Sequence, residues 1–210
     1  MTPTHPLLES LRPAPLIAIL RGLEPEHAVA TGQALVAAGF KALEVPLNRP
    51  GALQCIALLA RELPNEILVG GGTVLTAADV DAVYAAGGRL VVSPNTSAAV
   101  IARTVALGML SAPGVATPTE AFLALQAGAH ALKLFPCDMV GLGGLKALKS
   151  VLPAHIDLWP VGGITPQNMA AWKAAGATGF GIGSQLFSPG ATPEQLQARG
   201  QDYMSAWSSL

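Results

Sequence analysis

Short apolar or β-rich runs recur along the whole chain, with room for one helix between most neighbouring runs. The eight runs are PLIAIL (15–20), ALEVPL (42–47), ILVGG (67–71), RLVVSP (89–94), GMLSAP (108–113), ALKLFP (131–136), DLWPVGG (157–163) and GFGIGS (179–184). Runs of this length that are bounded by Gly or Pro are typical of strands buried on both faces. The pattern therefore predicts eight parallel strands.

The segments between these runs have the apolar spacing and the Ala, Leu and Glu content of helices, as in residues 24–40, 76–88 and 117–129. Two of them, TPTE (117–120) and TPQN (165–168), carry residues that favour a helix start. An Ala-Gly pair precedes several of the strands, and its glycines predict helix ends at Gly39, Gly87, Gly128 and Gly176.

Eight β/α units in 210 residues predict a (β/α)₈ TIM barrel that occupies residues 1–210 as a single domain. Residues Thr4 to Leu11 are expected to form an extra helix at the bottom of the barrel. An open doubly wound sheet is the alternative, because a local pattern cannot show closure. In both folds the functional residues lie at the carboxyl ends of the strands.

Composition removes several classes of function. Hydrophobic residues make up 51% of the chain and charged residues 12%, with a formal net charge of −1 and a pI near 6.4. Such a chain has no field that would attract nucleic acid, and no apolar run is long enough to span a membrane. The N-terminal residues lack the pattern of a secretory signal. We therefore expect a cytoplasmic protein that binds neither nucleic acid nor membrane.

The cysteines and histidines show no metal-binding spacing. Cys55 and Cys137 are far apart in sequence, and the four histidines form no HxH or HxxxH pair. Both thiols are expected to be reduced. Neither a metal nor a cofactor is expected.

The polar residues at the predicted strand ends form a small set, namely Arg21, Glu44, Asn48, Thr73, Asn95, Lys133 and Ser184. Lys133 lies within the apolar run ALKLFP, where strand alternation would turn its side chain into the barrel. Burial disfavours the ammonium form, and a neutral amine can attack a ketone. The alternative is a lysine whose stem packs while its amine reaches water. The absence of other polar residues in the run favours the reactive lysine.

Glu44 is a carboxylate in another buried run, ALEVPL. A buried charge needs a partner, and Lys133 could supply it across the barrel mouth. An ion pair that serves only stability is the alternative, but buried pairs stabilise weakly. We therefore interpret the two residues as a catalytic pair.

Glycine-rich turns follow the last two predicted strands. In TIM barrels the loops after strands seven and eight often bind phosphate through backbone N–H groups. The candidate phosphate-binding residues are Gly162, Gly163, Gly183 and Ser184. At two other strand ends, Thr73 and Pro94 are candidates for lining the mouth, although ordinary turns would have the same composition.

Seven motifs in this order, LIAILRG, LEVPLN, GGGTVL, SPN, LKLFP, VGGITP and GIGS, make the chain resemble the 2-keto-3-deoxy-6-phosphogluconate/galactonate aldolases. The resemblance covers about Pro15 to Phe187. It implies a metal-free class I aldolase on a TIM barrel, usually a homotrimer, that releases pyruvate and glyceraldehyde 3-phosphate from a phosphorylated keto-deoxy sugar acid.

By this resemblance Lys133 matches the Schiff-base lysine and Glu44 the carboxylate that moves protons. Arg21 would bind the substrate carboxylate, and Thr73 and Pro94 would line the pyruvate end. Gly162, Gly163 and Ser184 match the phosphate-binding turns.

Two departures bear on the substrate. Gluconate-type members resemble LEVTLRT and PTGGI, with Arg and Thr where this chain has Asn48 and Val161. Both point to the 6-phosphogalactonate epimer, with a gluconate-specific or dual-epimer enzyme as the alternative. Two further alternatives are another phosphate-binding barrel, such as an isomerase or a thiamin-phosphate-type synthase, and a phosphosugar-binding protein without catalysis.

Overall fold

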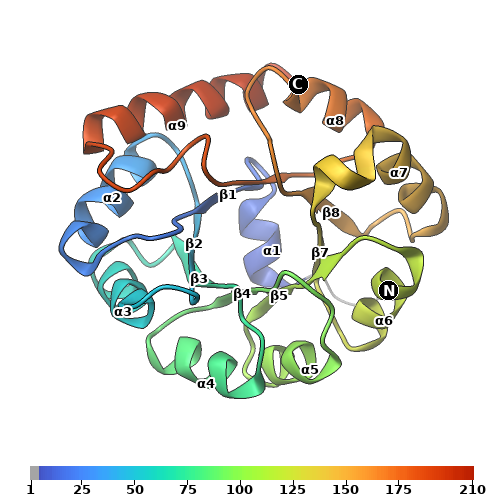
Figure 1. Ribbon diagram of the computed structural model, residues 1–210, viewed down its shortest axis with the longest axis horizontal. Helices are drawn as coiled ribbons and strands as arrows, with labels where there is room; N and C mark the ends of the chain where they lie inside the picture. The colour runs from blue at the N-terminus through green and yellow to red at the C-terminus, as the bar shows by residue number, and fades with distance from the viewer. Residues whose placement is uncertain (1–4) are drawn as a thin grey trace.

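The computed structural model describes residues 5–210, and its helices surround a curled parallel sheet (Figure 1). Within these residues the helices are α1 (Pro6–Leu11), α2 (Pro25–Ala37), α3 (Ala52–Glu62), α4 (Ala77–Ala85), α5 (Ala98–Ala106), α6 (Pro118–Gln126), α7 (Cys137–Val151), α8 (Met169–Ala175) and α9 (Pro193–Ser208). The expected extra helix is α1, although Thr4 lies outside the described residues. No helix in this part of the chain is both long and apolar enough to cross a membrane.

Every predicted strand position is occupied by a strand. The strands are β1 (Leu16–Ile19), β2 (Ala42–Pro46), β3 (Leu68–Gly72), β4 (Leu90–Val92), β5 (Leu110–Ala112), β6 (Gly114–Val115), β7 (Ala131–Leu134), β8 (Asp157–Pro160) and β9 (Phe180–Ile182). The fifth predicted strand is divided at Pro113 into β5 and β6. A proline has no N–H to donate to a sheet, so a break there is expected.

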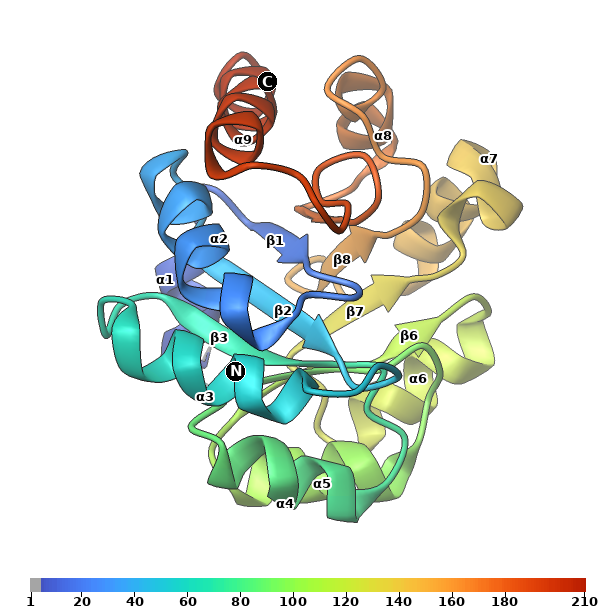
Figure 2. The same cartoon turned by 60° about the vertical axis from the view of Figure 1, so that its left-hand side comes forward.

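The strands form two parallel sheets, β5-β4-β3-β2-β1-β9 and β6-β7-β8. The first strand lies between β2 and the last strand, β9, which an open doubly wound sheet does not allow. A single parallel bridge between Val161 and Gly181 joins the end of β8 to β9. Figure 2 shows the strands of both sheets with their carboxyl ends at one side of the molecule.

Strand alternation divides the core into two clusters. The larger cluster lies between the strands and the helices and includes Leu16, Leu43, Val69 and Val91. The smaller one lies inside the curled sheet and includes Ile17, Ala42, Leu68, Leu90, Leu110 and Trp159. Every second residue of a strand therefore faces the interior, and Glu44 and Lys133 fall at such positions.

The helix α1 covers the end of the sheet at which the strands begin. Its Leu8 and Leu11 are buried in the interior cluster, and Figure 1 shows the helix across the middle of the ring. The interior is thus covered at the amino ends of the strands.

Most of the predicted helix ends are confirmed. Thr117 and Glu120 form a capping box at the start of α6. The four predicted stop glycines all have a positive φ, which favours glycine: Gly39 (109°), Gly87 (85°), Gly128 (100°) and Gly176 (115°). TPQN leads directly into a helix, because Asn168 is the N-cap of α8. Asn168 Oδ1 accepts a hydrogen bond from Thr165 N (3.0 Å), and Thr165 O accepts one from Met169 N (3.2 Å).

Candidate active site

Lys133 lies at the centre of a narrow cavity inside the curled sheet. It is only 7% exposed, and it pairs in register with Gly114 of β6 and Trp159 of β8. The cavity measures about 10 Å³ and is lined by Ile17, Ile19, Glu44, Val92, Ala112, Lys133, Trp159, Val161 and Gly181. The side chain of Lys133 therefore points into the interior, as strand alternation predicted.

The surroundings of Lys133 favour the neutral amine. Burial lowers the pKa of Lys133, and the positive charge of Arg21 lowers it further, whereas Glu44 raises it. The only aromatic contact described for its Nζ is with Phe135, whose ring centroid lies 4.9 Å away. The amine therefore loses its proton more readily than a lysine in water.

Glu44 is 2% exposed and projects from β2 into the same cavity. Burial raises the pKa of Glu44, and the charges of Lys133 and Arg21 oppose that rise. The ion pairs found within residues 5–210 are all on the surface, so Glu44 and Lys133 do not form a direct ion pair. Two partly neutral groups that can exchange protons fit this arrangement better than a structural salt bridge.

Gly72 on the neighbouring strand β3 makes room for the Glu44 carboxylate. A Cβ atom at position 72 would lie 2.6 Å from Glu44 Oε2, closer than real Cβ atoms come to any other atom. The glycine is therefore needed for space beside the carboxylate.

A wider cavity of about 380 Å³ opens at the carboxyl ends of the strands. Six of the predicted site residues line it, namely Arg21, Val161, Gly162, Gly163, Gly183 and Ser184. Ile19, Val161 and Gly181 line both cavities, so the two adjoin. The structure therefore brings the predicted lysine, acid and glycine turns into one site.

The turn after β8 lines the wide cavity, and hydrogen bonds hold its carbonyl groups. The carbonyl oxygens of Gly162, Gly163 and Ile164 accept hydrogen bonds from Cys137 Sγ (2.9 Å), Asn168 Nδ2 (2.8 Å) and Tyr203 Oη (2.8 Å). In a trans peptide the N–H that follows a carbonyl points the opposite way. The N–H groups of Gly163 and Ile164 therefore face away from these partners, which suits them to an anion.

The turn after β9 is held in a similar manner. Gly183 O accepts hydrogen bonds from the N–H groups of Leu186 (2.9 Å) and Phe187 (3.0 Å). The N–H of Ser184 points away from that carbonyl, and Ser184 itself is exposed in the wide cavity. Both turns thus line the same cavity.

Three predicted site residues lie at the correct end of the sheet but border neither cavity. Asn48, Thr73 and Pro94 follow β2, β3 and β4, and Asn48 is exposed. Thr73 has a φ of 54°, a left-handed conformation that a β-branched residue adopts only under strain. Strained residues gather at functional sites, which keeps Thr73 a candidate.

Sequence reasoning missed three residues of the site. Phe135 lines the wide cavity, and the alternation that turns Lys133 inward could have identified it. Trp159 follows from the same alternation in DLWPVGG. Gly72 carried no signal of its own, because GGG is foremost a turn sequence.

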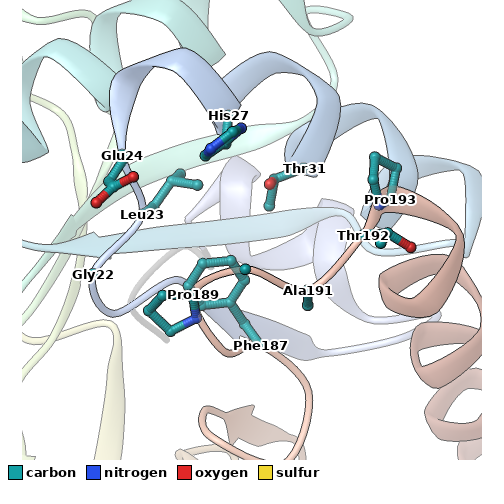
Figure 3. Close-up of a pocket in the computed structure, with 11 residues that line it drawn as sticks. Gly22, Leu23, Glu24, His27, Thr31, Phe187, Pro189, Ala191, Thr192 and Pro193 are labelled. Carbon is teal, nitrogen blue, oxygen red and sulfur yellow. The ribbon is translucent and has the colours of Figure 1, made fainter.

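Another cavity of about 240 Å³ adjoins this site, between the start of α2 and the loop from Phe187 to Pro193. Figure 3 shows Glu24, His27 and Thr31 on the helix side, opposite Phe187 and Pro189. The ligand atoms of Glu24, Glu26 and His27 lie within 4.8 Å of one another on the surface, a grouping that histidine spacing alone did not predict. These three residues do not line the cavity of Lys133.

Comparison with known proteins decides the family. Residues 7–199 match the model of the KDPG and KHG aldolase family. The chain belongs to the KDPG and KHG aldolases. A 2-dehydro-3-deoxy-6-phosphogalactonate aldolase of Escherichia coli strain K12 is 46% identical to it, over 92% of this chain and 94% of the relative.

Further comparisons agree with this assignment. A 2-dehydro-3-deoxy-phosphogluconate aldolase of Zymomonas mobilis is 37% identical over 74% of each chain. A solved structure described as native KDPGal superimposes with a TM-score of 0.91 at 45% identity and covers 93% of this chain and 95% of its own. The expected aldolase family is thereby confirmed.

Proposed function

We propose that this aldolase cleaves 2-dehydro-3-deoxy-6-phosphogalactonate to pyruvate and glyceraldehyde 3-phosphate through an imine on Lys133. The observation that carries the proposal is the narrow cavity, where a buried amine with a lowered pKa and a buried carboxyl with a raised pKa lie together. A binding protein without catalysis would gain nothing from two buried ionisable groups that form no ion pair.

The reaction begins when the neutral Lys133 amine adds to C2 of the keto acid. Loss of water gives a protonated imine, which withdraws electrons from C3. Glu44 takes the proton of the C4 hydroxyl as the C3–C4 bond breaks and glyceraldehyde 3-phosphate leaves. The remaining enamine is protonated at C3 and hydrolysed to pyruvate. The imine accepts the electrons, so we expect EDTA to leave activity intact.

The wide cavity accommodates the phosphate. Gly163, Ile164 and Ser184 line it and would supply backbone N–H donors, and Arg21, which also lines it, adds a positive charge. The charge of Arg21 also acts on Lys133 and Glu44 at the inner end of the site, so Arg21 remains the candidate for binding the substrate carboxylate. Removal of the phosphate from the substrate should lower kcat/KM strongly, because binding energy at this end positions the reacting carbons.

The galactonate epimer is supported by the pattern of identity. The relative named for it is 46% identical to this chain, and the gluconate relative 37%. Val161 lies at the junction of the two cavities. A valine leaves no buried polar group unpaired, so the gluconate epimer should also be accepted, with kcat/KM no higher than for the galactonate epimer. A strong preference for the gluconate epimer in parallel assays would contradict this assignment.

Borohydride reduction in the presence of pyruvate tests the imine. It should inactivate the enzyme and add a reduced pyruvyl group to Lys133, located by mass spectrometry of the peptides. Lys149→Ala, on α7, serves as the control and should still be labelled at position 133. Labelling elsewhere, or full activity in Lys133→Ala, would remove the imine from the mechanism and favour another phosphate-binding barrel activity.

We also propose that the two sheets close into one (β/α)₈ barrel and that residues 1–210 form one domain, supported by the neighbouring first and last strands and the Val161–Gly181 bridge. A homotrimer is proposed from the family resemblance. Light scattering should give three times the 21.3 kDa chain mass, and a monomer would contradict it. A cytoplasmic location is proposed from the free thiols of Cys55 and Cys137.

A further inference from the structure

The start of α2 brings three metal-binding groups together outside the site of Lys133. The ligand atoms of Glu24, Glu26 and His27 lie within 4.8 Å of one another. Glu24 is the N-cap of the helix, but its side chain makes no capping hydrogen bond. In the described part of the chain the ion pairs lie elsewhere, so no lysine or arginine pairs with either carboxylate. All three groups are therefore available to a cation.

The spacing of these groups suits a divalent transition-metal ion. Carboxylate oxygens and imidazole nitrogens bind Zn²⁺ at about 2.0–2.2 Å, which places the ligand atoms roughly 3–4 Å apart. All three residues are exposed, so rotation of their side chains can close the difference. An imidazole among the ligands favours zinc over calcium or magnesium, which prefer oxygen. Two carboxylate charges also outweigh the partial positive charge of about one half at a helix start.

The cavity of about 240 Å³ beside these groups contains a hydroxyl group that the protein does not use. Glu24, His27 and Thr31 line this cavity from α2, as Figure 3 shows. Thr31 is 4% exposed, and its hydroxyl makes no hydrogen bond within residues 5–210. Thr104, which is also buried on a helix, donates to Val100 O at 2.7 Å. The Thr31 hydroxyl is thus left for a molecule in the cavity.

We propose that Glu24, Glu26 and His27 bind one divalent transition-metal ion such as Zn²⁺ at the edge of this cavity, and that Thr31 hydrogen-bonds a water bound to the ion. Thr31 lies one helical turn after His27, so the two side chains share a face of α2. Three protein ligands leave a coordination position for water in a tetrahedral site. The cavity has room for several waters, since each occupies about 30 Å³.

A solvated helix start is the alternative explanation for the two glutamates, because carboxylates are favourable near a helix N-terminus. It accounts neither for the imidazole beside them nor for the unpaired hydroxyl in the cavity. It also predicts that Zn²⁺ binds here no more tightly than at any exposed histidine. Converging ligands instead predict one site whose affinity depends on each of them.

Calorimetric titration of the EDTA-treated, dialysed protein with Zn²⁺ tests the ligand set. We expect one equivalent to bind per chain, and His27→Gln to weaken binding at least 10-fold, because even the groups behind metal ligands contribute that much. His155→Gln, at an exposed position elsewhere, is the matched control and should bind as the parent does. Absence of a one-equivalent site, or equal weakening in both variants, would overturn the metal site.

Thr31→Val tests the part of the cavity. Valine keeps the branched shape and removes the hydroxyl, so the affinity for Zn²⁺ should fall about fivefold, the usual effect of one hydrogen bond. Thr104→Val, on α5, removes a hydroxyl far from this helix start and should leave the affinity unchanged. Parental affinity in a folded Thr31→Val protein would overturn the role of Thr31.

Turnover separates this site from the aldolase reaction, in which the ion takes no part. Pyruvate release should be equal in the EDTA-treated enzyme and in the enzyme with one equivalent of Zn²⁺. A loss of turnover in the treated enzyme that Zn²⁺ restores would overturn this separation. If borohydride fails to label Lys133, the proposed function fails, whereas the zinc titration and its variants keep their expected results.

Discussion

At the scale of single residues, the site depends on two ionisable groups being held away from water. Burial moves the pKa of Lys133 down and that of Glu44 up, so each spends more time neutral than it would in solution. Desolvation of this kind is costly for folding, because the charged forms lose their hydration. Proteins keep such groups at functional sites at the expense of stability.

The pH dependence of stability should reveal that cost at Glu44. Its raised pKa means that the folded chain still binds a proton that the unfolded chain has lost above about pH 4.5. The free energy of unfolding therefore falls as pH rises through this window. Glu44→Gln should be more stable than the parent by roughly 1–2 kcal/mol at pH 8 and nearly equal to it at pH 4.5.

Urea denaturation at the two pH values measures this difference. Glu66→Gln, at an exposed position, is the matched control and should show no such dependence. Equal stability of Glu44→Gln and the parent at pH 8 would show that the carboxylate is better solvated than its burial indicates.

The space beside Glu44 gives a second prediction. In Gly72→Ala the new methyl group would meet the Glu44 carboxylate and force it to move. We expect turnover to fall at least 10-fold, since proton transfer depends on that position, and stability to fall by about 1–3 kcal/mol. Borohydride trapping at Lys133 should persist.

Gly143→Ala, within α7, is the control for this substitution. Nothing lies within 4 Å of a Cβ at that position, and alanine favours a helix more than glycine does. Its activity should match the parent. Unchanged turnover in Gly72→Ala would mean that the carboxylate has room that the structure does not show.

At the scale of elements, sequence patterns predicted the order and type of the strands and the glycine helix ends well. They did so because alternation, glycine stops and capping residues act locally. At TPQN the same local chemistry leads into α8: Asn168 is its N-cap, and the Asn168 side chain bonds back to Thr165 N and Gly163 O before the first helical residue, Met169. The division of the fifth predicted strand at Pro113 could not be predicted from the sequence, because it depends on which strands pair with β5 and with β6.

Tyr203 joins α9 to the turn after β8 through its bond to Ile164 O. In Tyr203→Phe that buried carbonyl loses its donor, so stability should fall by about 1 kcal/mol and the turn should loosen. We expect the KM for the phosphorylated substrate to rise several-fold while exchange of pyruvate protons is unchanged. Steady-state assays of both reactions measure the contrast.

Tyr84→Phe is the control, because Tyr84 is exposed on α4. It should change neither quantity. Should pyruvate exchange fall together with phosphosubstrate affinity in Tyr203→Phe, the tyrosine would support the whole site and not the phosphate turn alone.

At the scale of the whole molecule, sequence could place residues at strand ends but could not rank them. Lys133, Glu44, Val161 and the glycine turns meet in one site, whereas Asn48, Thr73 and Pro94 do not border its cavities. Which strand ends converge depends on the curvature of the sheet and on loop lengths. Neither property can be read from a single segment, so Gly72 could not be assigned to the site from the sequence.

The helix α1 covers the interior at the amino ends of the strands, so among the described residues the wide cavity at the carboxyl ends is the opening of the site. In the proposed reaction pyruvate stays attached to Lys133 at the inner end, and the aldehyde lies between it and this opening. The products must then depart in a fixed order, the phosphorylated aldehyde before pyruvate. Product inhibition should therefore be competitive for pyruvate and noncompetitive for glyceraldehyde 3-phosphate. Competitive inhibition by both would mean that departure is random and that a second exit exists.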